Sequence, residues 1–267
     1  MPTAPASSVI TRVADVLNMF SPRKALVSID EIAACLDVST ASAYRYASEL
    51  SNAGLLSRTS GHYRLGPKII ELEYLIRSYD PIIRAGHSLM TGLAELTGCD
   101  VLLCNIYDLH VVNVHHIRGG QPMEITYTKG LPMPIFRGSQ AHVVLAHMDR
   151  RKLKRIHDQA VLDPELRPDV HAIGETWQEF TRTLKQIRSQ GYYISRGELD
   201  ADVTGIAAPV FGDDKEIVAS LVLSRRSSLP SRLSEEALIN LVVEAAREIS
   251  RRIDQAALVE TELVPAD

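Results

Sequence analysis

The chain has 267 residues, 45% of them hydrophobic, and a formal net charge of −4. This length favours two domains, because single domains most often have about 100–150 residues. No apolar run approaches the roughly 18 residues that cross a bilayer, so no membrane partner is expected. The first eight residues lack the basic and apolar regions of a signal peptide. Three cysteines without metal-type spacing fit a reducing compartment, and we expect a cytoplasmic protein.

Charge is unevenly distributed along the chain. Residues 1–68 contain seven Lys and Arg and five Asp and Glu, whereas the remainder contains 22 and 28. A mildly basic head on an acidic body indicates an anionic partner for the head. A difference this small also arises by chance, so charge alone does not decide the function.

The first 66 residues have the pattern of three helices and a hairpin. Apolar residues recur at helical spacing over 8–20, and Ser28 and Glu31 form a capping box that opens a second helix. Ser39 or Thr40 caps a third helix, which ends before Gly54. Two short strands around "TSGH" follow. This order predicts a winged helix-turn-helix domain over residues 1–66.

The third helix has a packed face and a polar face. Ala43, Tyr46, Ala47 and Leu50 share the face that we expect in the core. In a helix-turn-helix the N-terminal residues of the second helix lie nearest the base edges, and Arg45 suits guanine O6 and N7. The alternative is that Arg45 and its neighbours are ordinary solvated residues. The predicted DNA-binding residues are Ser39, Thr40, Ala41, Ser42, Tyr44 and Arg45 on the helix and Arg58, His62 and Arg64 on the wing.

The rest of the chain predicts a linker helix and an α+β domain. The helix, at 67–80, carries an apolar stripe that we expect to pack against a second copy of the chain. The domain follows at 81–257, with a flexible tail at 258–267. Its strands are predicted at 100–107, 110–117, 123–130, 191–199, 205–211 and 217–225, its helices at 81–96, 139–148, 149–159, 176–189 and the C-terminal region, and a loop at 160–174. We expect an antiparallel sheet with helices packed to one side.

Three stretches carry a resemblance to a known family. They are "SAYR" with "ELSNAGLL" and "YRLG", then "GSQAHVVLAHM", then "GYYISRGELDADVTGIAAPVF". In this order they resemble the IclR family of bacterial transcriptional regulators over roughly residues 8–255. The resemblance implies a DNA-binding head, a linker helix and a GAF-like effector-binding domain, assembled as a homodimer or homotetramer. Tyr44 and Ala47 depart from the residues usual in the family, so the preferred DNA sequence does not transfer.

The resemblance also implies a pocket for a small organic acid. A helix N-terminus suits a carboxylate, and the matching stretch begins at Gly138. Gly205 and Val222 offer no side-chain hydrogen bond, which favours a larger, aromatic acid over a small keto acid. Further hypotheses are Arg137 or Arg118 as a counter-charge and His142 or His115 as hydrogen-bond donors to the effector. Each of these residues also has a purely structural interpretation. The predicted effector-binding residues are Ser139, Gln140, Ser195, Gly205, Val222, Ser224, Arg137, His142 and His115.

Two other classes of protein remain as alternatives. The histidines of "DLHVVNVHH", with His142, suggest a metal-binding enzyme, but zinc needs three or four converging ligands. No H-E-x-x-H, G-x-S-x-G or phosphate-loop motif is present. A winged-helix module that binds only proteins is the second alternative. We therefore predict a regulator of a catabolic operon that reads a pseudo-palindromic operator in double-stranded DNA, with no enzymatic activity, no metal and no cofactor besides its effector.

Overall fold

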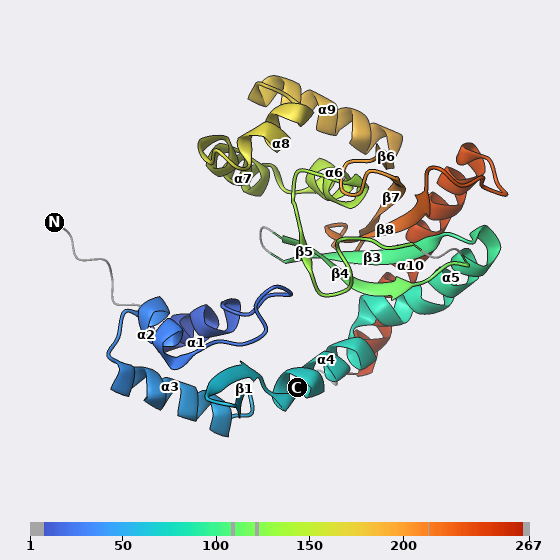
Figure 1. Ribbon diagram of the computed structural model, residues 1–267. Coiled ribbons are helices and arrows are strands. Elements are labelled where there is room, and N and C mark those ends of the chain that lie inside the picture. Colours follow the sequence, from blue (N-terminus) through green and yellow to red (C-terminus); the bar gives the residue numbers. More distant parts are fainter. Residues whose placement is uncertain (1–7, 108–109, 121–122, 213, 264–267) are drawn as a thin grey trace. The chain divides into compact units, whose positions relative to one another are not determined.

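The computed structural model describes residues 8–107, 110–120, 123–212 and 214–263 (Figure 1). The chain divides into two compact units, Met1–Asp80 and Pro81–Asp267. No helix in the described ranges is long and apolar enough to cross a membrane.

The first unit is a winged helix-turn-helix, as predicted. Each of its first three helices begins after a serine whose hydroxyl accepts a backbone N–H from the residue three positions on, and Ser28 and Glu31 complete the predicted capping box. The elements are α1 (Val9–Asn18), α2 (Ile29–Leu36), α3 (Thr40–Asn52), β1 (Leu56–Thr59), β2 (His62–Leu65) and α4 (Pro67–Tyr79).

The core of this unit contains the predicted face of α3. Ala43, Tyr46, Ala47 and Leu50 are all buried, together with residues of α1, α2 and the wing. Gly66 is required where the wing ends, because a Cβ there would lie 2.1 Å from the Gly54 carbonyl oxygen. α4 then follows with no buried residue within this single chain.

The second unit is built on a six-stranded antiparallel sheet in the order β5-β4-β3-β8-β7-β6. α6 packs on one face, with α9 against it, while α5 and α10 pack on the other (Figure 1). Alternate residues of each strand therefore enter two separate cores: Leu102 and Val222 face α6, whereas Leu103 and Leu221 face α5 and α10. The prediction that helices cover one side only is wrong. The strands are β3 (Asp100–Tyr107), β4 (His110–Ile117), β5 (Pro132–Met133), β6 (Tyr193–Arg196), β7 (Val203–Phe211) and β8 (Ile217–Arg226), and the helices α5 (Pro81–Thr97), α6 (Ser139–His147), α7 (Arg150–Leu162), α8 (Arg167–Ile173), α9 (Trp177–Gln190) and α10 (Glu235–Leu263).

Two predicted segments have a different structure. Residues 123–130 form no strand, and the third strand is only β5. The alternating pattern of 123–130 arises because Ile125 and Tyr127 face a cavity, not because the backbone pairs in a ladder. Residues 160–174 are not a loop, since α7 continues to Leu162 and α8 occupies Arg167–Ile173. Pro168 stands in the first turn of α8, where a proline is tolerated.

Two boundaries also differ from the prediction. β6 ends at Arg196, because Gly197 adopts a positive φ of 69° and starts a turn. α10 continues to Leu263, so the segment predicted as a flexible tail begins as helix. The hairpin turn predicted between β3 and β4 falls on residues 108–109, which lie outside the described residues.

Candidate DNA-binding surface and ligand cavity

The N-terminal end of α3 is exposed, as a surface for DNA requires. Ser39, Thr40, Ala41, Tyr44 and Arg45 are exposed, and Tyr44 has 47% of its surface accessible. Ser42 is half-buried, because its hydroxyl lies 3.2 Å from the Ser39 hydroxyl in the helix cap. Ser39 therefore already uses its hydroxyl hydrogen within the cap, whereas the Ser42 hydroxyl keeps its hydrogen to donate to a phosphate.

Tyr46 orients the arginines beside the α3 surface. The guanidinium carbons of Arg12 and Arg45 lie 5.8 and 5.9 Å from the centre of its ring, and Arg12 Nη1 donates to the Tyr46 hydroxyl over 2.9 Å. Stacking on an aromatic ring restricts the orientation of a guanidinium group, and this contact itself uses none of the N–H donors. The sequence analysis did not predict this role for Arg12, because its position in α1 gives no sign that its side chain reaches α3.

The wing places its basic residues on two faces. In the register of β1 and β2, Arg58 lies opposite Tyr63 and Ser57 lies opposite Arg64. Arg58 therefore shares a face with buried Tyr63, while His62 and Arg64 lie on the other side. All three are exposed, so the wing offers charge in two directions.

Six of the predicted effector-binding residues meet around one cavity in the second unit. It lies between the N-terminus of α6 and the sheet, and has a volume of about 40 Å³. The rest of its wall is formed by side chains of β3, β5 and the segments before β5 and β7. The six residues are Ser139, Gln140, Ser195, Gly205, Val222 and Ser224.

Gly205 makes room for two hydroxyl groups in this cavity. A Cβ at residue 205 would lie 2.7 Å from Ser139 Oγ and 3.1 Å from Ser195 Oγ. Ser139 begins α6, whose first-turn amides have no partner within the helix. The polar end of the cavity thus combines hydroxyl groups with the positive end of a helix dipole, which suits an anionic oxygen.

The other three predicted residues do not line the cavity. Arg137 is exposed and its Nε donates to the Glu198 carbonyl oxygen over 3.1 Å. His142 is buried on another side of α6, where its Nδ1 donates to the Gly138 carbonyl oxygen and its ring stacks on Tyr193. His115 lies on the opposite face of the sheet, with its Nε2 2.9 Å from Nδ1 of His87. These three side chains thus lie outside the wall of this cavity, because the sequence did not show the face on which each side chain lies.

The segment before β5 covers the cavity, and the sequence analysis did not predict that it would form part of the wall. Ile125 and Tyr127 contribute to the wall, and between them Thr126 binds Asp200 twice: its Oγ1 donates over 2.5 Å and its N–H over 3.2 Å. Asp200 also lines the cavity, and among the described residues of the wall it is the one with a carboxyl group. A ring-sized ligand needs more than the present volume, so this segment must move when such a ligand enters.

A carboxylate of the chain lies beside the N-terminus of α6. Glu198 accepts the N–H of Gly138 over 2.8 Å and the hydroxyl of Tyr193 over 3.1 Å. Burial, followed by the charge of Glu198, raises the pKa of Tyr193 to about 12. Tyr193 therefore stays protonated and keeps donating to Glu198 at neutral pH.

The histidines do not gather into a metal site. His115 contacts His87, His116 pairs with Asp100 at 2.8 Å, and His142 contacts Gly138. Within the described part of the chain, no three His, Cys, Asp or Glu side chains are placed to hold one ion. The side chain of His110 lies outside the described part of the structure.

A winged helix-turn-helix is a DNA-binding fold, and in this chain it precedes a sheet domain that contains a small cavity. The family described as "Bacterial transcriptional regulator IclR C-terminal" matches residues 76–253, and the "IclR helix-turn-helix domain" matches residues 9–60. The chain therefore belongs to the IclR family of DNA-binding transcriptional regulators, as the sequence predicted. These matches are to regulators and not to enzymes.

Individual proteins show the same likeness along most of the chain. The transcriptional regulator KdgR of Dickeya chrysanthemi is 26% identical over 89% of this chain and 79% of its own length. The structure of an IclR regulator from Silicibacter sp. is similar with a TM-score of 0.75 and 20% identity, covering 92% of this chain and 96% of that chain. The IclR homologue of Microbacterium hydrocarbonoxydans, solved with 4-hydroxybenzoate, has a TM-score of 0.69 and 18% identity, covering 93% of this chain and 100% of that chain.

Proposed function

We propose that the second unit binds a small organic acid in the cavity at the α6 N-terminus, and that binding changes the affinity of the winged helix-turn-helix for its operator. The observation that carries this proposal is the meeting of Ser139, Gln140, Ser195, Gly205, Val222 and Ser224 around one cavity. These residues come from four separate elements, so their meeting is a property of the fold and not of one sequence motif.

The wall favours an aromatic carboxylate. Its polar part combines hydroxyl groups with the α6 N-terminus, which suit an anionic oxygen without a counter-cation, while the Asp200 carboxylate lies at the segment that covers the cavity. Its other side is apolar, with Leu102, Met133 and Val222 among the contributors. The 4-hydroxybenzoate bound to the Microbacterium homologue is an acid of this kind.

The DNA target in this proposal is a pseudo-palindromic operator of a catabolic operon, read in the cytoplasm by a homodimer or homotetramer. Support comes from α4, whose Ile70, Leu72, Tyr74, Leu75 and Ile76 are all exposed within the single chain. Apolar area of this size on one helix suits a second copy of the same helix. Two heads related by a two-fold axis then read two half-sites.

A thermal-shift screen of carboxylic acids tests the cavity. We expect at least one aromatic carboxylate to raise the melting temperature and to change the affinity for a DNA site selected from a random pool. A stabilising acid that leaves DNA affinity unchanged would refute the coupling. If no carboxylate stabilises the protein, the cavity assignment is wrong.

A further inference from the structure

Two fully buried polar side chains on the α6 side of the sheet have no hydrogen-bond partner. Asn113 of β4 and Ser220 of β8 are both 0% exposed, and neither the amide of Asn113 nor the hydroxyl of Ser220 is hydrogen-bonded to a described residue. Elsewhere in the described chain, Arg12 and His157 have such an atom, but each uses another side-chain nitrogen in a hydrogen bond. An unpaired buried polar group destabilises a fold, so its presence in a native structure calls for a physical explanation.

These two side chains flank Cys104, which lines the cavity at α6. The register of the sheet places Asn113 opposite Cys104 on one side and Ser220 opposite it on the other. Side chains at directly opposite positions have Cβ atoms about 4.5–5.5 Å apart. Val111 and Val222, two residues from Asn113 and Ser220, lie in the core on the α6 side, and side chains along a strand alternate between the two faces. Asn113 and Ser220 therefore lie on the face that carries the cavity, next to its wall.

The hydroxyl groups of the cavity lie at the other end of the same strands. Ser224 lines the cavity opposite Gly205, and it follows Ser220 by four residues, which span about 13 Å of β8. Val222 and Leu102, which lie opposite each other, separate the two ends with apolar side chains. This face of the sheet thus has hydroxyl groups at one end, an apolar middle, and the two unpaired groups at the other end.

The wall at this distal end offers a ligand little else to bind. Burial raises the pKa of the Cys104 thiol, which therefore stays uncharged, and a thiol is a weak hydrogen-bonding group. Among the described residues of the wall there is no lysine or arginine. A ring-sized acid enlarges the cavity of about 40 Å³, and enlargement past Cys104 reaches Asn113 and Ser220. A polar group at this point is satisfied by hydrogen bonds and not by a counter-charge, which favours an uncharged group.

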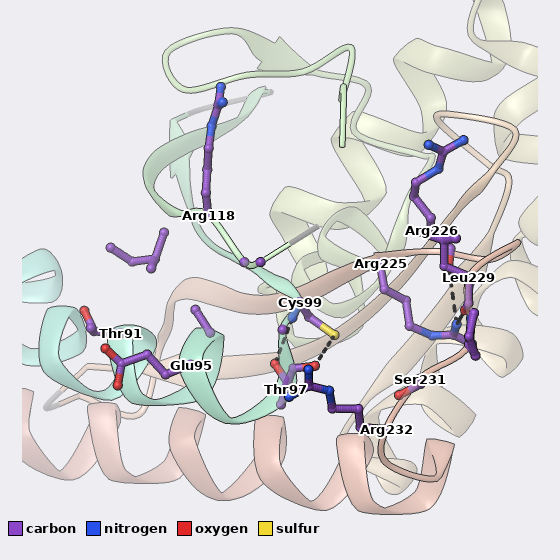
Figure 2. Close-up of a pocket in the computed structure, with 16 residues that line it drawn as sticks. Thr91, Glu95, Thr97, Cys99, Arg118, Arg225, Arg226, Leu229, Ser231 and Arg232 are labelled. Atoms are coloured by element: carbon purple, nitrogen blue, oxygen red, sulfur yellow. Dashed lines mark hydrogen bonds between the residues drawn. The ribbon is translucent and has the colours of Figure 1, made fainter. Parts of the chain in front are cut away.

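A larger cavity of the second unit, with a volume of about 700 Å³, gives a contrast. It lies between the end of α5, the start of β3 and the loop before α10 (Figure 2). Thr97, a buried polar side chain in its wall, donates its hydroxyl to the Leu93 carbonyl oxygen over 2.7 Å and accepts the N–H of Cys99 over 3.1 Å. Arg118, which the sequence suggested as a counter-charge for the acid, lines this cavity and not the one at α6. Thr97 is therefore satisfied without a ligand, unlike the two side chains beside Cys104.

We propose that Asn113 and Ser220 determine the specificity of the cavity at α6 by binding a second, uncharged polar group of the acid, at the end opposite its carboxylate. This inference rests on the proposed function, because it concerns the acid bound in that cavity. Amide and hydroxyl groups both donate and accept, so they suit a hydroxyl or a carbonyl group. Hydrogen bonds of about 2.8 Å at both ends leave about 7 Å of the span of about 13 Å for the acid. An aromatic ring with a carboxylate and a hydroxyl group at para positions fits this length.

Calorimetric titration with matched pairs of acids tests this proposal. The full chain is titrated with benzoate, phenylacetate and cinnamate, each with and without a para-hydroxyl group. For at least one pair we expect the hydroxylated acid to bind about tenfold tighter or more, because a site that hydrogen-bonds a hydroxyl group rejects the analogue without it. In Asn113→Leu and in Ser220→Ala this preference should fall to about threefold or less, while the unsubstituted acid keeps its affinity.

Ser250→Ala is the matched control. The Ser250 hydroxyl donates to the Ala246 carbonyl oxygen over 2.9 Å and accepts the N–H of Phe211 over 2.9 Å, on α10 and away from the cavity. Its loss should lower the melting temperature of the ligand-free protein and leave the hydroxyl preference unchanged. Ser220→Ala should instead leave the melting temperature unchanged or raise it, because it removes a buried hydroxyl group that has no partner.

Three results would overturn the proposal. They are equal affinity for both members of every pair of acids, full preference retained in either cavity variant, and a melting temperature of ligand-free Ser220→Ala that falls as far as that of Ser250→Ala. If none of these acids binds, the aromatic class of acid in the proposed function fails as well, whereas binding without a hydroxyl preference refutes only the role of Asn113 and Ser220. If circular dichroism shows that Asn113→Leu is unfolded, Ser220→Ala alone decides.

Discussion

Ser139 and Gly205 face each other across the cavity at α6, so closely that a methyl group on residue 205 would lie 2.7 Å from the Ser139 hydroxyl oxygen. The missing side chain of Gly205 therefore creates the space in which two serine hydroxyl groups converge. The segment before β5 covers this space. The Thr126 hydroxyl group holds it to Asp200, in the loop before β7.

Filling this space should block the ligand without unfolding the protein. In Gly205→Ala we expect the added methyl group to displace the Ser139 and Ser195 hydroxyl groups and to abolish stabilisation by carboxylates. Such overpacking typically costs about 1–3 kcal/mol, which leaves a folded domain. Thermal-shift titration with the best acid of the screen checks this. The control is Gly92→Ala, where the new methyl group has no atom within 4 Å, and there the response should persist. An undiminished response in Gly205→Ala would contradict the cavity assignment.

Arg45 should account for base preference and not only for charge. We expect Arg45→Ala to lose about 1–3 kcal/mol of discrimination between the selected site and a scrambled one. Arg45→Lys separates the two roles, because lysine keeps the charge but cannot donate in the same two-pronged way. It should retain affinity for scrambled DNA and lose preference for the selected site. Fluorescence anisotropy at fixed salt measures both affinities. A lysine variant with full preference would show that Arg45 contacts only phosphates.

The pair Thr126 and Asp200 should control access to the cavity. Thr126→Val removes the hydroxyl donor while keeping the shape, and a single hydrogen bond is worth about 0.5–1.5 kcal/mol. We expect residues 123–131 to exchange amide hydrogens several-fold faster and the ligand to associate faster. Hydrogen exchange by mass spectrometry and stopped-flow association measure the two effects. Unchanged exchange in this segment would mean that other contacts keep it closed.

Glu31 should titrate far below an ordinary glutamate. The backbone N–H of Ser28 and then the side chain of Lys24 lower the pKa of Glu31 to about 2. Because the folded pKa is depressed, the stabilisation by this carboxylate is present above about pH 4.5 and is lost as the pH falls toward 2. Carbon-13 chemical shifts of the Glu31 carboxyl group should show a midpoint near 2, and Lys24→Gln should raise it. A midpoint near 4.5 in the wild-type protein would show that the capping box is open in solution.

Local sequence patterns were sufficient to predict the helix-turn-helix. The caps at Ser28 and Ser39 and the apolar face of α3 depend only on residues that are close together in the sequence. The family resemblance also led to six residues that line one cavity, and their contact with an effector stays a prediction. Contacts between residues that are distant in the sequence could not be predicted in the same way. The face on which His115 lies depends on the irregular register between β3 and β4, and the contact of Thr126 with Asp200 joins residues 74 positions apart.

The central claim is that an acid in the α6 cavity changes the affinity for DNA. The most direct measurement is the dissociation constant for the selected DNA site, at fixed salt, with and without a saturating carboxylic acid identified by thermal shift. Coupling free energies between two ligands are typically about 1–3 kcal/mol, so we predict a change of about 5- to 150-fold in the wild-type protein and none in Gly205→Ala. An unchanged dissociation constant in the wild-type protein, or the same change in Gly205→Ala, would contradict this account.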